Sequence, residues 1–198
     1  MPYSNVTFFD SSIIQSNRNI INKIIEDDPL NAEALTTRAM LNFIYSNAGV
    51  SWEFGGNANT KLGEDSERAL VIDPNNALAL AFLTFSNVQK VYWTIDKTQR
   101  VLIFRKAEKE VNELSKRYPD HYMTLLVQGA YHLSKLYHRE LKKDVDKNYL
   151  EYSKASLISS RKGLQNGVSD IFLPYIHTTT MQYIADGLRV SGNLSEGV

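Results

Sequence analysis

The stretch Asp73-Pro74-Asn75-Asn76-Ala77-Leu78-Ala79-Leu80 decides the fold, because it occurs three times in related form. Asp28-Pro29-Leu30-Asn31-Ala32-Glu33-Ala34-Leu35 lies 45 residues before it, and Pro119-Asp120-His121-Tyr122-Met123-Thr124-Leu125 lies 45 residues after it. Each proline ends one helix, and the Asn or Asp residues after it can cap the next, since their side chains accept hydrogen bonds from the unpaired N–H groups at a helix start. The repeat therefore predicts pairs of helices joined by similar turns.

The segments between the prolines have helical spacing of apolar residues. Between residues 96 and 118, apolar residues recur every three or four positions and predict a surface helix with one buried face: Val101, Phe104, Ala107, Val111, Leu114 and Tyr118. The segment 77–91 is apolar on nearly every face and should be covered on most sides. No run alternates with the period of a strand. We expect an all-α protein with helices near 11–27, 31–47, 62–72, 76–93, 97–117, 121–138, 147–165 and 171–189.

Composition excludes several classes of protein. The chain has 198 residues, a length that suits one domain. Its 22 Lys and Arg balance 22 Asp and Glu, whereas a protein that binds nucleic acid directly needs a basic surface. It has no cysteine, so disulfides and thiolate metal sites are excluded. No apolar run approaches the ~20 residues that span a bilayer, and we expect no membrane insertion.

The repeat resembles the tetratricopeptide family, in which antiparallel helix pairs recur about every 34 residues. The spacing of that family's second helix is kept at Asn17, Ile21, Ile24 and Pro29, and again at Leu62, Ser66, Ala69, Pro74 and at Ala107, Val111, Leu114, Pro119. Its small residue at the helix crossing is matched by Ala39, Thr84 and Gly129. The resemblance implies a right-handed solenoid of about eight helices, and a single domain over 1–198 with repeat-like units near 11–47, 62–93, 97–138 and 147–189.

The period of 45 residues departs from the family. The additional 11 residues make about three helical turns, so both helices of a pair can lengthen without rotating their apolar faces. No Gly or Pro interrupts 75–118, which predicts longer helices there, whereas Gly49, Gly55 and Gly56 predict a loop in the first pair. Long repeats of this kind resemble helical regions of bacterial transcription regulators and signalling proteins. This resemblance implies a cytoplasmic protein, or a periplasmic one if the segment belongs to a longer protein.

A search for catalytic constellations finds none. His132 and His138 are six residues apart, which does not suit a zinc site on one helix face, and we expect surface or capping histidines. No phosphate-binding glycine loop and no nucleophile elbow occurs. The carboxylates Glu53, Glu64, Asp65 and Glu67 could line a cleft or complement the dipole at a helix start. We expect no catalytic, cofactor or metal-binding residues, and therefore no enzyme.

In the family, the first helices line a concave face that binds peptides or partner helices. Carried over, this face is a partner-binding groove of apolar side chains: Met40, Phe43, Leu78, Phe82, Phe85, Tyr92, Met123, Leu126 and Ala130. An apolar groove of this size should not stay exposed. It could be filled by the chain's own 171–189 helix or Trp52 loop, by a second copy of the chain, by a partner segment, or by an apolar small molecule.

Trp52, in the glycine-bearing loop, and Trp93, at a helix end, are candidate anchors, because aromatic residues dominate binding hot spots. The function that these patterns predict is a non-catalytic module for protein–protein interaction or oligomerisation, such as the sensor or assembly domain of a bacterial regulator. The partner is then another protein or a second copy. The alternative is a component of a transport or sensing system that binds an apolar small ligand between helices 76–93 and 121–138.

Overall fold

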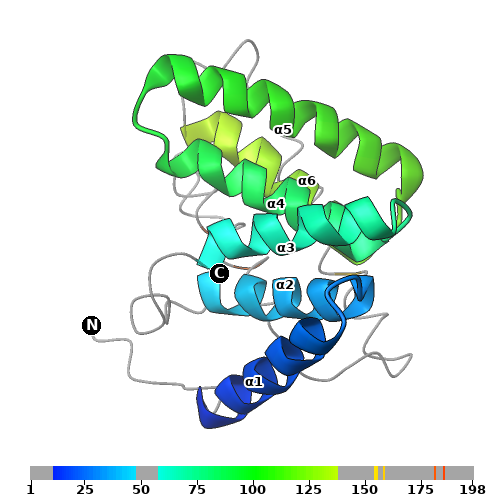
Figure 1. Ribbon diagram of the computed structural model, residues 1–198. Coiled ribbons are helices and arrows are strands. Elements are labelled where there is room, and N and C mark those ends of the chain that lie inside the picture. Colours follow the sequence, from blue (N-terminus) through cyan, green and yellow to red (C-terminus); the bar gives the residue numbers. More distant parts are fainter. Residues whose placement is uncertain are drawn as a thin grey trace.

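The computed structural model describes residues 11–47 and 58–137, together with five isolated positions further along the chain. The described part is entirely helical and contains no strand. Its six helices are α1 (Ser11–Asp27), α2 (Ala32–Asn47), α3 (Ala58–Ile72), α4 (Ala77–Trp93), α5 (Lys97–Arg117) and α6 (Tyr122–Tyr137). Of these, α1 to α4 follow one another up the view of Figure 1, α5 lies at the top, and α6 lies behind α4. The all-α prediction is confirmed for these residues. Of the helices predicted at 147–165 and 171–189, the structure describes only five positions, each of them helical: Lys154, Ala155, Ile158, Met181 and Ala185. The predicted loop around Gly49, Gly55 and Gly56 lies outside the described residues.

Three turns, those that end α1, α3 and α5, have the same backbone hydrogen bonds. In each, the N–H of the residue before the proline donates to the carbonyl four residues earlier, at 2.8–2.9 Å. The N–H of the capping residue donates to that same pre-proline residue's carbonyl, and the capping residue's own carbonyl begins the next helix. The equivalent residues are 45 positions apart; the pre-proline ones are Asp28, Asp73 and Tyr118, and the capping ones are Asn31, Asn76 and His121. The sequence period is thus a period of the structure.

The caps explain why the helices restart where they do. The side-chain oxygens of Asn31 and Asn76 each accept from the backbone N–H three residues later, at 2.9 Å. In the third turn His121 replaces asparagine, and its Nδ1 accepts from the N–H of Met123 at 3.3 Å. These residues stand just outside their helices, so α2, α4 and α6 begin one residue later than predicted.

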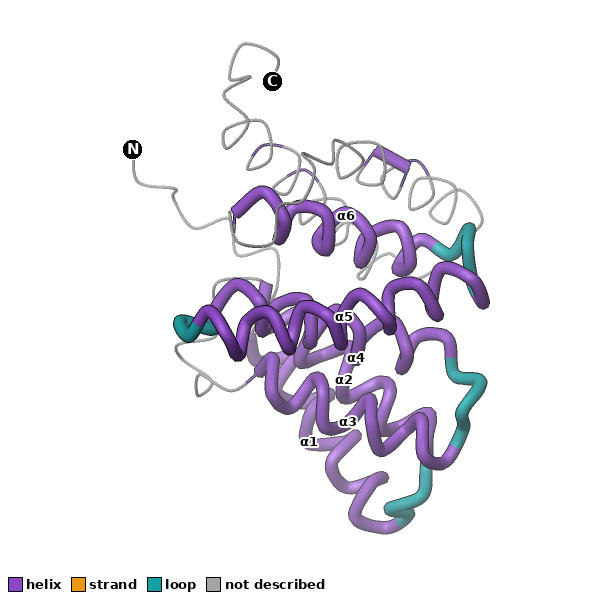
Figure 2. The backbone as a smooth tube through the Cα atoms, turned by 90° about the horizontal axis from the view of Figure 1, so that it is seen from above, coloured by secondary structure: helices purple, strands orange, loops and turns teal. Residues whose placement is uncertain are grey.

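Side chains join each of these turns to the neighbouring one. The Tyr118 hydroxyl donates to the carbonyl of Asn75 at 2.7 Å, and the Arg117 guanidinium donates to the carbonyl of Pro74 at 2.8 Å. The Asn76 amide donates to the hydroxyl of Thr36 on α2 at 2.9 Å. As Figure 2 shows, the three turns follow one another along one side of the molecule, and the turn between α4 and α5 lies on the opposite side.

The core forms around α4, which lies against α2 and α6 and is also packed by α3 and α5. Phe43 on α2 meets Phe82 and Phe85 on α4, with ring centroids 5.5 and 4.9 Å apart. α4 contacts α2, α3, α5 and α6, which confirms that the 77–91 segment is covered on most sides. On the predicted face of α5, Phe104, Ala107, Val111 and Leu114 are buried as expected. Val101, and Tyr118 just after the helix, are only partly buried.

The His121 cap makes the stability of this turn depend on pH. Burial lowers the pKa of His121 below its ordinary value of 6.5. A lowered folded-state pKa means that the cap's contribution is complete above pH 6.5 and is lost as the pH falls through the folded pKa. His121→Asn, which copies the other two turns, should stay within about 1 kcal/mol of the wild type at pH 8. It should lose less stability than the wild type between pH 7 and 5, measured by urea denaturation. Equal losses would contradict a titrating cap.

Candidate functional site

The predicted groove residues are buried in the described structure. Six of the nine have at most 1% of their surface exposed: Phe43, Phe82, Phe85, Met123, Leu126 and Ala130. The other three, Met40, Leu78 and Tyr92, are partly buried against the same cluster. α4 packs against both α2 and α6, and the apolar side chains of these helices belong to one buried cluster. Partner binding by these residues stays a prediction, and it would require the core to open.

The same packing bears on the predicted cavity for an apolar ligand between α4 and α6. Phe85 and Val88 on α4 and Leu126 and Val127 on α6 belong to one buried cluster. Binding of an apolar ligand between these helices stays a prediction.

Of the two candidate anchors, Trp93 lies on the surface and Trp52 lies outside the described residues. Trp93 ends α4 with 78% of its surface exposed, and Ile95, two residues later, is 92% exposed. The turn that carries them is held firmly. The Thr94 hydroxyl donates to the carbonyl of Lys90 at 2.6 Å, and the Arg100 guanidinium donates to the carbonyls of Thr94 at 2.8 Å and of Ile95 at 3.2 Å. Two large apolar side chains are therefore displayed on a fixed turn.

The carboxylates predicted near a helix start have a different setting. α3 begins at Ala58, four residues earlier than expected, so Asp65 lies in mid-helix and is 4% exposed. Its two oxygens accept from Arg38 on α2, at 2.6 Å from Nη2 and 2.8 Å from Nε. Asp65 therefore does not complement the dipole at a helix start, and that interpretation is wrong for this residue. It forms a bidentate ion pair that joins α3 to α2. Glu64 and Glu67 are exposed on the same helix, and Glu53 lies outside the described residues.

Arg38 is the centre of a polar network that joins three helices. Besides Asp65 on α3, it donates from Nη1 to the side-chain oxygen of Asn22 on α1 at 3.0 Å. The hydrogen bond to Asp65 raises the pKa of Arg38 above its ordinary value, which keeps the guanidinium charged. The Asn42 amide lies 3.4 Å from Asp65 and completes the network.

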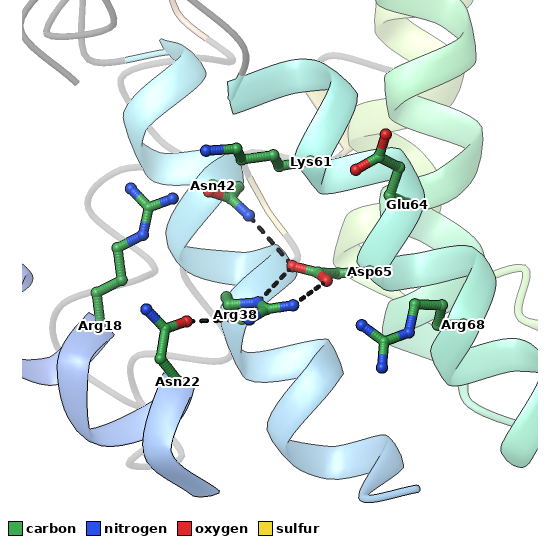
Figure 3. Close-up of a pocket in the computed structure, with 8 residues that line it drawn as sticks. All are labelled: Arg18, Asn22, Arg38, Asn42, Lys61, Glu64, Asp65 and Arg68. Atoms are coloured by element: carbon green, nitrogen blue, oxygen red, sulfur yellow. Dashed lines mark hydrogen bonds and ion pairs between the residues drawn. The ribbon is translucent and has the colours of Figure 1, made fainter. Parts of the chain in front are cut away.

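A polar cleft of about 330 Å³ opens above this network, with α2 as its floor and α1 and α3 as its sides (Figure 3). It is lined by Arg18, Asn22, Arg38, Asn42, Lys61, Glu64, Asp65 and Arg68. Four of these side chains are basic and two are acidic. The cleft therefore carries a net positive charge although the whole chain is neutral. Sequence analysis found its acidic residues but missed its cations, which are spread over three helices.

Part of this arrangement recurs one period later. Asn87 and Glu110 are 45 residues beyond Asn42 and Asp65, and the Asn87 amide donates to the Glu110 carboxylate at 2.7 Å. Burial raises the pKa of Glu110, and the hydrogen bond from Asn87 opposes that rise. An asparagine on the first helix that binds a carboxylate on the second is thus a feature of the repeat.

The histidines have two different roles. His121 caps α6, as predicted for a capping histidine. His132 is buried and packs edge-on against Tyr131 with ring centroids 5.0 Å apart, so it is neither a surface residue nor a cap. His138 lies outside the described residues. Within the described part of the chain, no three His, Asp or Glu side chains gather as a group that could hold a metal ion.

Comparison with known proteins assigns the chain to no family. A scan of family models, a search of curated proteins and a search of solved structures each gave no match. Among the helices of the described region, none combines the length and the apolar character that crossing a bilayer requires.

Separating Arg38 from Asp65 tests the network. Arg38→Met should lower the free energy of unfolding by about 3 kcal/mol, because it leaves a buried carboxylate without its cation. Replacing both residues, as Arg38→Met with Asp65→Leu, should recover much of that loss, since neither charge then remains buried. Urea denaturation of both single variants and the double variant gives the coupling. Losses that simply add would contradict a direct ion pair.

Proposed function

We propose that this chain is a non-catalytic, tetratricopeptide-like solenoid that acts as a protein-interaction or oligomerisation module, of the kind found in bacterial regulators and signalling proteins. The observation that carries the proposal is the recurrence of one turn, with the same hydrogen bonds, every 45 residues. Repeats of this type are stabilised by contacts between neighbours and present extended surfaces to partners.

The α4–α5 turn is the surface that best fits a partner. Trp93, Ile95 and Leu102 are all large, apolar and more than half exposed, and they lie within ten residues of one another. Single exposed apolar residues are ordinary on protein surfaces, but a tryptophan held on a rigid turn is the type of residue that dominates binding energy. Burying Trp93 or Ile95 in an interface would contribute on the order of 1.5–3 kcal/mol each.

The solution mass, measured by light scattering at two concentrations, tests this surface. If the partner is a second copy, the mass should rise with concentration, and Trp93→Ser should lower the associated fraction. Val71→Ser is the matched control, because Val71 is 80% exposed but lies by the turns on the opposite side. An equal effect of both variants would contradict a specific role for Trp93.

A constant monomer mass would exclude self-association and leave a different protein as the partner. A photoreactive side chain at position 93, compared with one at position 71, should then give specific cross-links in cells that express the chain. Cross-links at neither position, or equal ones at both, would contradict the proposal.

The variant Phe82→Asp distinguishes the groove predicted from the sequence from the α4–α5 turn as the binding site. Because Phe82 is fully buried, placing a charge there should unfold the protein and abolish its helical circular dichroism. A folded Phe82→Asp variant that had lost only its association would restore the groove as the binding site and contradict the assignment to the α4–α5 turn.

A further inference from the structure

We propose that the polar cleft bordered by α1, α2 and α3 binds a small organic anion through its carboxylate or phosphate groups. This site is separate from the α4–α5 turn and does not depend on protein–protein binding.

The Arg38 guanidinium is a hydrogen-bond donor that is held in one orientation at the floor of the cleft. A guanidinium has five N–H groups. Three of those of Arg38 bind Asp65 and Asn22, which fixes the plane of the group. Two N–H groups remain outside these bonds, and the side chain is 21% exposed, so the guanidinium is held in place without being sealed off. A fixed guanidinium suits carboxylate and phosphate oxygens because its donors already have the required spacing.

Side chains on α1 and α3, the two sides of the cleft, add positive charge to that of Arg38. Figure 3 shows Arg18 from α1 and Lys61 from α3 extending toward the same part of the cleft, above Asn42. Arg68 lies further along α3, beyond Asp65. With Arg38 these make four cations against the carboxylates of Asp65 and Glu64, a net charge of two positive units. An anion that enters the cleft meets cations on three helices.

The second repeat lacks most of these cations. One period later, Arg18, Arg38 and Arg68 are replaced by Gly63, Leu83 and Glu113. The asparagine–carboxylate pair is kept there, and Lys106 stands in the place of Lys61. A carboxylate on the second helix is therefore accommodated without any of the three arginines. In the first repeat Arg38 and Arg68 also have structural bonds, to Asp65 and to the carbonyl of Pro29, but the concentration of cations around one cleft is particular to that repeat.

The size and lining of the cleft define the class of ligand. A volume of about 330 Å³ is at the small end of ligand sites. None of the eight lining side chains is aromatic or aliphatic, so the cleft offers no apolar side chain to an acyl chain. Binding would depend on charge and hydrogen bonds. The ligand that fits is compact and carries more than one negative charge.

Isothermal titration of the full chain with citrate and, separately, with inorganic phosphate tests the site and distinguishes carboxylate from phosphate recognition. Sodium chloride keeps the ionic strength constant. At least one anion should bind saturably with one ligand per chain, and Lys61→Gln should weaken it about tenfold or more, the loss expected when a charged hydrogen-bond partner is removed. Lys106→Gln, at the equivalent position one repeat later, should leave the affinity unchanged.

Arg68→Gln provides a second variant on the opposite side of Asp65, and circular dichroism checks that each variant is folded. Failure of both anions to bind up to about 10 mM, a Kd too weak for a specific site, would overturn the proposal. So would binding that neither Lys61→Gln nor Arg68→Gln weakens, because the anion would then lie elsewhere. Equal weakening by Lys106→Gln would assign the effect to overall charge and would also overturn it.

Discussion

The structure depends on one constraint, the turn that stops a helix at a proline and restarts the chain at a capping side chain. Proline cannot continue a helix that needs its N–H, and the cap satisfies one of the N–H groups that the next helix leaves unpaired. Because the turn recurs every 45 residues with the same hydrogen bonds, α2, α4 and α6 each begin in the same way. The links from Tyr118 and Asn76 to the preceding repeat then hold successive turns together.

This regularity explains why an apolar stripe that resembles a binding groove is the core. The sequence correctly indicates that the stripe cannot stay exposed. The side chains that cover it are those of neighbouring first helices, such as Phe43 against Phe82 and Phe85. Each fully buried phenylalanine contributes on the order of 1.5–3 kcal/mol, so opening this face for a partner would cost several such contributions. Binding is therefore better placed on the outside, at Trp93 and in the cleft around Arg38.

The features that the sequence predicts correctly are those that depend on residues close together in the chain. Helices 11–27 and 97–117 were predicted to the residue, because caps, prolines and apolar spacing mark both ends. The start of α3 was missed because its first turn is held by tertiary contacts: the Ser86 hydroxyl donates to the carbonyl of Asn59 at 2.8 Å, and the Asn59 amide donates to the carbonyl of Ser86 at 3.3 Å. The cleft was missed for a similar reason, since its cations lie between positions 18 and 68 and meet only after three helices pack.

The central claim is that the faces of α2, α4 and α6 are closed on one another, and the absence of cysteine from the chain makes it directly measurable. A single cysteine placed at Ala130 or Val88, both fully buried, can be compared with one at Ile95, which is 92% exposed. Under native conditions we expect a thiol reagent to label Ile95→Cys rapidly, and Ala130→Cys and Val88→Cys orders of magnitude more slowly, at rates limited by opening of the core. Labelling of Ala130→Cys as fast as Ile95→Cys would show an open face and contradict the account.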